Sequence, residues 1–592
     1  MVMLFDDNQA RNELFRNAQS PLYDSKWPLG NRPIVNEPLL VWSQAIMTPG
    51  RIGFYIDYSE LTGPGIHRFY VCRTHGSTGR VTVDFDSAGD SHIPVSGTLV
   101  WEDTDLDIKT VEVAVPNKTV NGIHSVRLVL SNPTGGAELH LEDQTYAIGR
   151  IDDGTIAPES DAVFYDADAA AGGNGTMATP YNSIYTARDE FVSSNKMYLY
   201  GRGITVIDDT ENVGGHNCIW LPTKETSSED DRVYVMAWPG YNWEFNALTE
   251  HGLGWYSRTD QNGQSNYITF RDIEFSDFVT TDAGSYSGNE PGGIVSIYGS
   301  IEMLTVEYCN FRNIESRTNT GGINVWGANG VRVWRCSITD IRSRGEHTNG
   351  NAAGIMTYDS NKMSVQRCYF SGMHVGIYQK RVGNVGDVTI GARFNVFDGD
   401  SDIQNMGVLH GASGLSGVCH DNVVVQGNVF INCSANGARQ QPGYEPAAID
   451  GGHWYVGNVF VRCAAGESST LQFQDTYEVV IANNIFLDCR KTWGFPVDDS
   501  DAGDEIRYID YNHEEGTTLT SQIIEFRGVN YNSVAAFNAA FPPWEANASS
   551  GDPLFVDSAT DFRLAPGSPC IGTGMGGVDK GVYLTGIEEV GI

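Results

Sequence analysis

One six-residue phrase recurs seven times along the middle of this chain, and the repeat constrains the fold more than any other feature. Each copy ends in an apolar residue, and these residues occupy positions 311, 338, 370, 397, 430, 460 and 486. The steps between them run from 26 to 33 residues, which is the length of one coil in a solenoid of stacked strands. The repeat therefore predicts an all-β chain whose main body is a right-handed, single-stranded parallel β-helix.

A column of equivalent side chains stands two residues before each end position. It begins with cysteines and continues with asparagines: Cys309, Cys336, Cys368, Asn395, Asn428, Asn458 and Asn484. Because stacked coils place equivalent residues about 4.8 Å apart, the amides can hydrogen-bond along the column. A second cysteine column comprises Cys433, Cys463 and Cys489. Neither column has the close pairs of a zinc site, so we predict buried, unpaired thiols.

The segment before the repeat consists of short strands in which apolar and polar residues alternate. Examples are 80–85, 97–101, 111–115 and 125–130. Turns separate them every 12 to 15 residues or so, which is typical of an antiparallel β-sandwich. We place this sandwich at 49–156, and expect it to fold independently and to be dispensable for catalysis.

The remaining boundaries follow from the repeat. Residues 1–48 have no clear periodicity, and we interpret them as an N-terminal arm or anchor. The parallel β-helix is predicted over 158–495. Residues 496–592 are predicted to form the C-terminal part of the β-helix domain and its cap.

Two motifs near the end of the sandwich resemble the Calx-β family. The segments 131–139 and 151–154 are similar to that family's last hairpin and its closing acidic pair. The resemblance implies a Calx-β-like module and raises calcium as a ligand. However, the family's earlier acidic pair falls where this chain has Val115, Pro116, Asn117 and Lys118, so a spacer or adhesion role is the alternative.

Two further phrases resemble pectate-lyase-like right-handed β-helix proteins. The opening phrase lies at 164–184 and the closing phrase at 552–569, so the resemblance covers about 160–592. The family includes polysaccharide lyases, glycoside hydrolases and tailspikes. It implies an extracellular protein with a polysaccharide partner, which could be acidic, but the phrases mark the fold rather than the reaction.

A second strand in each coil offers candidate binding residues. Its leading aliphatic residue should point inward and its neighbours outward, which gathers aromatic, amide and charged side chains along one face. Such a face suits sugar rings and their hydroxyls, although the aromatic residues could also simply cover the coil. The candidates are Asn324, Trp326, Tyr358, Tyr378, Gln474, Asp475 and, in a neighbouring loop, His347.

Two enzyme mechanisms fit this face. In a lyase, Arg381 would neutralise a uronate carboxylate, Lys380 or His410 would remove the adjacent proton, and Tyr378 or Tyr358 would serve the leaving group. His410 also has the parity of an interior residue, and the Lys380 and Arg381 pair could be a solvated surface feature.

In a glycoside hydrolase, two carboxylates flank the bond. The available set is Asp359, Asp450 and Asp475. We prefer the lyase slightly, and keep as the alternative a phage tailspike, fibre or adhesin that binds host-surface glycan with or without cutting it.

The net charge of −36 excludes most nucleic-acid partners, because phosphate contacts need a surplus of Lys and Arg. No apolar run is long enough for a membrane span, and no secretory signal is visible at the start. We therefore expect either a secreted protein whose signal was removed or a virion component. A tailspike would be a homotrimer, and otherwise we expect a monomer.

Overall fold

The protein is described here as a computed structural model, which covers most of the chain beyond the N-terminal arm. It describes residues 49–590 apart from 56–57, 62–63, 75–76, 88–92, 106, 117–121, 140–145, 152–153, 208–211, 214–215, 221–225, 227–231, 248–251, 259–265, 280–291, 298–300, 317–319, 344–351, 359, 361, 381–388, 400–405, 412–421, 441–451, 465–468, 474–478, 496–505, 516–523, 527, 543, 584–587 and 589. The predicted arm at 1–48 lies outside the described residues.

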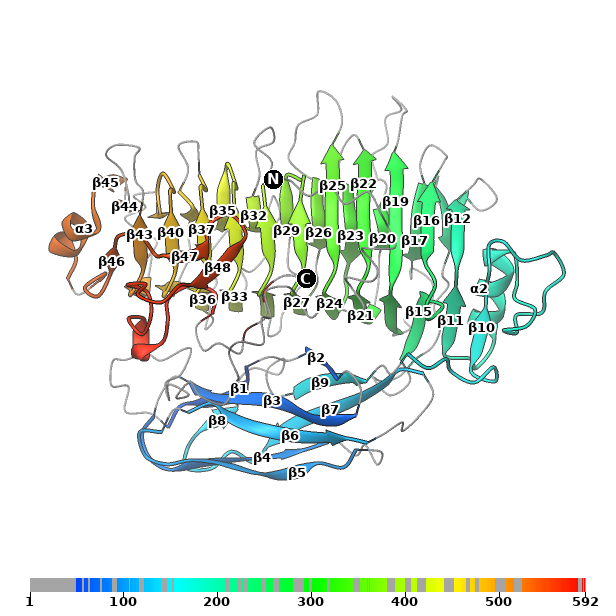
Figure 1. Ribbon diagram of the computed structural model, residues 1–592, viewed down its shortest axis with the longest axis horizontal. Helices are drawn as coiled ribbons and strands as arrows, with labels where there is room; N and C mark the ends of the chain where they lie inside the picture. The colour runs from blue at the N-terminus through cyan, green and yellow to red at the C-terminus, as the bar shows by residue number, and fades with distance from the viewer. Residues whose placement is uncertain are drawn as a thin grey trace.

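Three long sheets run side by side along the rod, and nearly all their strands pair in parallel (Figure 1). The first sheet comprises β10 (Ala162–Phe164), β11 (Tyr198–Gly201), β15 (Val233–Ala237), β18 (Asn266–Arg271), β21 (Ile301–Glu307), β24 (Gly330–Trp334), β27 (Lys362–Gln366), β30 (Thr389–Arg393), β33 (Asn422–Gln426), β36 (Gly452–Val456), β39 (Val479–Ala482) and β42 (Ile506–Asp510). The second comprises β12 (Gly203–Ile207), β16 (Trp243–Ala247), β19 (Ile273–Val279), β22 (Asn310–Ser316), β25 (Ser337–Ser343), β28 (Tyr369–Ser371), β31 (Val396–Asp398), β34 (Val429–Ile431), β37 (Val459–Val461), β40 (Ile485–Leu487), β43 (His513–Glu515) and β46 (Ser549–Ser550).

The third sheet completes each coil. It comprises β13 (Asn212–Val213), β14 (His216–Trp220), β17 (Gly252–Arg258), β20 (Gly292–Ile297), β23 (Thr320–Trp326), β26 (Ala352–Tyr358), β29 (Val375–Lys380), β32 (Met406–Gly411), β35 (Asn436–Gln440), β38 (Leu471–Gln472), β41 (Trp493–Phe495), β44 (Ile524–Phe526) and β45 (Val529–Tyr531). The predicted all-β fold with a parallel β-helix is confirmed.

Stacked phenylalanines fill the interior at the end positions of the repeat. The rings of Phe397 and Phe430 lie 4.8 Å apart at 7°, and Phe460 continues the stack at 4.7 Å. The third sheet faces this stack with glycines, because a Cβ at Gly376 or Gly437 would lie 2.6 Å from a phenylalanine ring atom. The phenylalanine rings can therefore stack in this way only where the facing strand has a glycine.

The asparagine column forms a continuous ladder at the turn between the first and second sheets. The Asn395 amide donates to the Asn428 side-chain oxygen at 3.0 Å, and the same contact joins Asn428 to Asn458. The preceding cysteines continue this pattern, since the Cys336 N–H donates to the Cys368 sulfur at 3.4 Å. The cysteines in this column, Cys309, Cys336 and Cys368, are fully buried and unpaired, which confirms the prediction for them.

The segment before the rod forms two packed sheets. One contains β6 (Lys109–Val115), β3 (Gly65–Thr74), β1 (Arg51–Phe54) and β8 (Glu138–Leu139). The other contains β2 (Tyr58–Leu61), β9 (Tyr146–Ile151), β7 (His124–Ser131), β4 (Val81–Asp86) and β5 (Ser96–Trp101). Most of their pairs are antiparallel, and the sandwich lies alongside the first sheet (Figure 1).

The sandwich is joined to the rod by buried contacts. Tyr58 is fully buried, its hydroxyl donates to Glu307 at 2.8 Å, and its ring packs on Trp334. Arg271 pairs with the same carboxylate at 2.8 Å. Removing the sandwich would uncover Trp334 and Glu307, and its independent folding stays a prediction.

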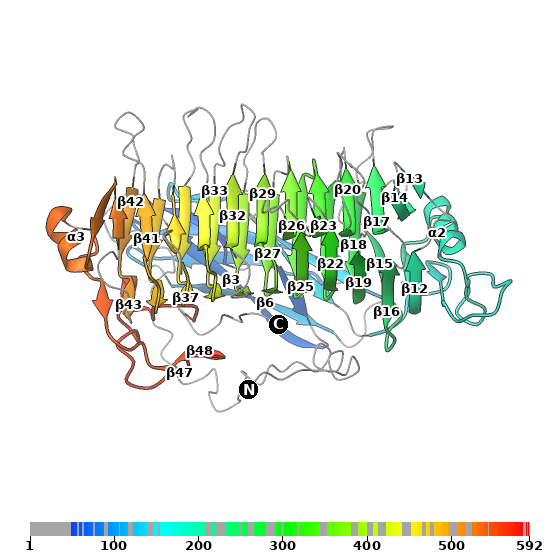
Figure 2. The same cartoon turned by 90° about the horizontal axis from the view of Figure 1, so that it is seen from above.

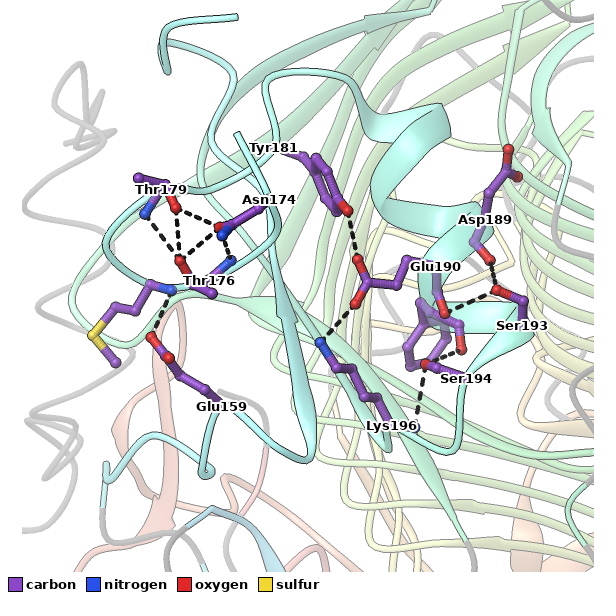
Figure 3. A network of polar contacts seen from close by, with 12 residues as sticks. Glu159, Asn174, Thr176, Thr179, Tyr181, Asp189, Glu190, Ser193, Ser194 and Lys196 are labelled. Carbon is purple, nitrogen blue, oxygen red and sulfur yellow. Dashed lines mark hydrogen bonds and ion pairs between the residues drawn. The ribbon is translucent and has the colours of Figure 1, made fainter. Parts of the chain in front are cut away.

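Both ends of the rod are capped. Helix α2 (Ile184–Ser193) follows a loop in which Asn174 accepts hydrogen bonds from Thr176, while Glu190 joins Tyr181 to Lys196 (Figure 3). At the other end lie α3 (Val534–Ala540), the hairpin of β47 (Phe555–Asp557) and β48 (Asp561–Leu564), and η3 (Met575–Gly577). None of the helices in the described ranges is long and apolar enough to cross a membrane.

Candidate functional site

The register of the third sheet places the predicted site residues in rows along its outer face. Asn324 pairs with Met356, Met356 with Tyr378, Tyr378 with Leu409, Leu409 with Arg439, and Arg439 with Gln472. We call these six residues the central row. The adjacent outer row contains Trp326, Tyr358, Lys380 and Gly411. The strands that carry both rows lie next to one another in Figure 2.

Trp326 and Tyr358 form the aromatic part of this face. Their ring centroids lie 4.9 Å apart at 78°, and both side chains are partly exposed. Burial, with the neighbouring Tyr378, raises the pKa of Tyr358 to about 12. The Tyr358 phenol therefore stays protonated, and able to donate, throughout the neutral range.

Two of the predicted surface residues are less accessible than expected. Tyr378 is 5% exposed and packs with Ala353, Met356 and Val375, while Asn324 is 1% exposed. Alternation along the strand does point them away from the phenylalanine core, but outward direction does not ensure exposure. The buried Asn324 amide nitrogen has no hydrogen-bond partner among the described residues.

Arg439 is a component of this face that sequence reasoning missed. It is partly exposed, and its Nε atom is buried without a hydrogen-bond partner in the described part of the chain. Burial lowers the pKa of the guanidinium, and the nearby Tyr378 phenol opposes that effect. Arginine keeps its charge in proteins, so this is a cation near the Tyr378 phenol.

The omission of Arg439 has a definite cause. Asp450 was the candidate predicted from this coil, whereas the structure places the third-sheet strand of the coil earlier, at Asn436–Gln440. Gly437 could have indicated this strand, because third-sheet glycines recur opposite the stacked phenylalanines, as Gly376 does opposite Phe397 and Gly437 opposite Phe460. Asp450 itself lies outside the described residues.

Several other candidates can be placed only by backbone register or not at all. Lys380 lies beside Tyr358 in the outer row, and its side chain is not described. His410 pairs with Gln379, which is fully buried. The side chain of His410 is not described. The candidates outside the described residues are His347, Asp359, Arg381, Gln474 and Asp475.

The calcium expectation can be tested on the described carboxylates of the sandwich. Asp105 and Asp107 flank the ammonium of Lys109 at 2.7 and 3.7 Å, so a lysine already neutralises this cluster. Across the described ranges, no group of three His, Cys, Asp or Glu is arranged to hold a metal. These residues do not fit a calcium site, and the closing pair Asp152 and Asp153 lies outside them.

The sequence matches no protein-family profile and no curated protein. Similar solved structures include the apo form of the Calx CBD1 domain, at 18% identity over 17% of this chain and 96% of that domain, with a TM-score of 0.16. CBD12 from CALX1.2 is 15% identical over 20% of this chain and 50% of that one, and calcium binding domain CBD12 of CALX1.1 is 14% identical over 21% and 55%, both with a TM-score of 0.16. The chain thus spans about half the length of the two CBD12 structures. Likenesses this weak carry no conclusion about ligands.

Proposed function

We propose that this protein binds an anionic polysaccharide outside cells, along the outer face of the third sheet, and cleaves it by elimination. The observation that carries the proposal is a pair of buried donor nitrogens on this face. Arg439 and Asn324 each keep a buried nitrogen without an acceptor among the described residues. Buried polar groups in proteins are normally paired, so these two favour a ligand rich in acceptors.

The charge pattern supports an anionic ligand over a neutral one. From Asn324 to Gln472, the central row contains one cation, and neither it nor the adjacent outer row contains a carboxylate. Guanidinium groups bind carboxylates through short, charge-assisted hydrogen bonds. The next described carboxylate along this row is Glu525, two coils beyond Gln472, and it pairs with Lys491 at 2.9 Å. In a protein of net charge −36, a stretch of face with an arginine and no described carboxylate favours an anionic ligand. Trp326 would add a platform for a sugar ring.

The elimination would use three of these residues. Arg439 would neutralise the uronate carboxylate, which acidifies the hydrogen on the adjacent carbon. Lys380, in register with Tyr358, would accept that proton as the carbon–hydrogen bond breaks. Tyr358 would protonate the departing glycosidic oxygen as its bond to carbon breaks and a carbon–carbon double bond forms.

The test is Arg439→Ala assayed on a panel of polyuronates, following the ultraviolet absorbance of the unsaturated product. Loss of the charge-neutralising group should lower kcat/KM by about 100-fold or more. Arg462→Ala is the matched control, because Arg462 lies at an exposed turn after the second sheet. Binding of polyuronate with no unsaturated product from the wild-type protein would reject cleavage and leave an adhesin or tailspike role. Absence of binding would reject the proposal.

A further inference from the structure

Gln472 follows Arg439 in the central row, one coil further along the rod. Its side-chain oxygen accepts a hydrogen bond from the Asn436 amide nitrogen at 3.3 Å. Asn436 is fully buried on β35, three residues before Arg439, and Gln472 is partly exposed. The face thus holds a buried amide that contacts a more accessible one beside the guanidinium.

The orientation of both amides follows from one backbone carbonyl. The Asn436 nitrogen also donates to the carbonyl oxygen of Ser469. A carbonyl oxygen can only accept, so Asn436 must turn its NH2 group toward Ser469 and toward Gln472. Gln472 must then present its oxygen to Asn436, which leaves its NH2 group on the other side of the amide.

We propose that Gln472 determines specificity for a carboxylate-bearing sugar, and that Asn436 is the positioning residue that fixes its amide. This inference rests on the proposed function and names the chemistry of the same site. The NH2 group of Gln472 and the guanidinium of Arg439 come from neighbouring coils, about 4.8 Å apart at the backbone. Both are donors, and no described residue accepts a hydrogen bond from the Gln472 nitrogen. A substrate carboxylate held by both would have each oxygen paired with a donor.

The site should therefore reject a sugar whose carboxylate has been converted to an ester. Methyl esterification removes the charge and replaces one acceptor oxygen by a methoxy group, leaving buried donors without partners. Polar sites discriminate strongly against ligands that leave their groups unpaired. A neutral glycan of the same backbone should bind more weakly than the polyuronate.

The experiment compares a polyuronate with its methyl ester on wild type, Gln472→Glu and Gln472→Met. Gln472→Glu places a carboxylate where the NH2 group stood, and should raise KM for the polyuronate at least about tenfold, with little effect on the ester. Gln472→Met, without donor or charge, should give a smaller rise. The split between KM and kcat distinguishes this role from loss of the catalytic acid, which would lower kcat.

Asn436→Asp tests the positioning step. Aspartate cannot donate to Ser469 or to Gln472, so the Gln472 amide should turn over and discrimination between polyuronate and ester should fall as in Gln472→Glu. If this buried change prevents folding, the Gln472 variants decide the question. If both Gln472 variants discriminate as the wild type does while Arg439→Ala still lowers kcat/KM, this inference is overturned and the proposed function stands. A wild-type protein that binds no polyuronate would overturn both.

Discussion

The outer faces of the first and third sheets both carry arginines, and the two faces treat them in opposite ways. On the first sheet, Arg271 pairs with a Glu307 oxygen that also accepts a hydrogen bond from Tyr58 of the sandwich. On the third sheet, Arg439 has no carboxylate partner among the described residues. The outer face of the first sheet is covered by the sandwich of the same chain. The third has donors that another molecule could pair.

This contrast shows how a repeat of one architecture can serve two purposes. All coils share the same stacked core. Residues that point outward do not take part in this stack, so they can differ from one sheet to another. Buried charges are stable when paired and costly when alone. We therefore distinguish the first sheet, whose outer face packs against the sandwich, from the third sheet, whose outer face we propose to bind a ligand, by whether their arginines pair with carboxylates. Three further experiments test this distinction.

The largest expected effect is on the covered face. Glu307→Ala removes the closer of the two carboxylates beside the buried Arg271 and leaves Asp272 at 3.6 Å. It should lower the free energy of unfolding by about 3 kcal/mol. The exposed pair of Arg51 and Glu138 provides the control, since Glu138→Ala should cost about 0–1 kcal/mol. Chemical denaturation measures both. Equal small effects would mean that the covered face is no more dependent on pairing than the surface.

Glu545 extends the comparison to the interior, where it is a fully buried carboxyl group. It ends the asparagine ladder by accepting from Asn512 at 2.9 Å, and its other oxygen has no partner in the described part of the chain. Burial raises the pKa of Glu545 to about 7, with Asp510 adding to the rise and the hydrogen bonds from Asn512 and Trp493 opposing it. Glu514 and Lys580 are the other ionisable groups that interact with it.

The pH dependence follows from this shift. Between pH 4.5 and about 7 the folded chain keeps the Glu545 proton and the unfolded chain loses it, so the free energy of unfolding should fall as pH rises. The loss is on the order of 3 kcal/mol. Glu545→Gln should flatten this part of the profile, measured by denaturation at several pH values, without changing glycan binding. An unchanged slope would contradict the assignment, and altered binding would show that an unpaired interior charge also serves the ligand.

The smallest effect is expected on the ligand face. Arg439→Met removes a partly buried charge that has no described partner, and should raise the free energy of unfolding by about 1 kcal/mol, as functional residues often reduce stability. Arg462→Met should leave stability nearly unchanged. A substantial loss in Arg439→Met would show that this guanidinium is paired in the folded protein and would remove the contrast between the faces.

The sequence repeat predicted many of the residues in the interior of the rod and at the turn between the first and second sheets. The end positions became the phenylalanine stack, and the asparagine column became the ladder that runs from Asn395 to Asn484. Its continuation to Asn512 was missed because the end position of that coil is Glu514, a charged residue where the repeat has apolar ones. The glycine that marks β35 was overlooked for a similar reason, since a glycine reports on a neighbouring ring only once the coils are stacked.

The sequence by itself determined the parallel β-helix, its coil length and the direction of side chains along each strand, because neighbouring coils carry equivalent residues at regular spacing. Only the tertiary structure decided which outward side chains are buried and which are paired. Tyr58 reaches Glu307 across 249 positions of sequence, and no periodicity encodes such a contact. Arg439, Asn436 and Gln472 likewise acquire their arrangement only when separate coils are brought together, because hydrogen-bond orientation depends on atoms that the repeat does not specify.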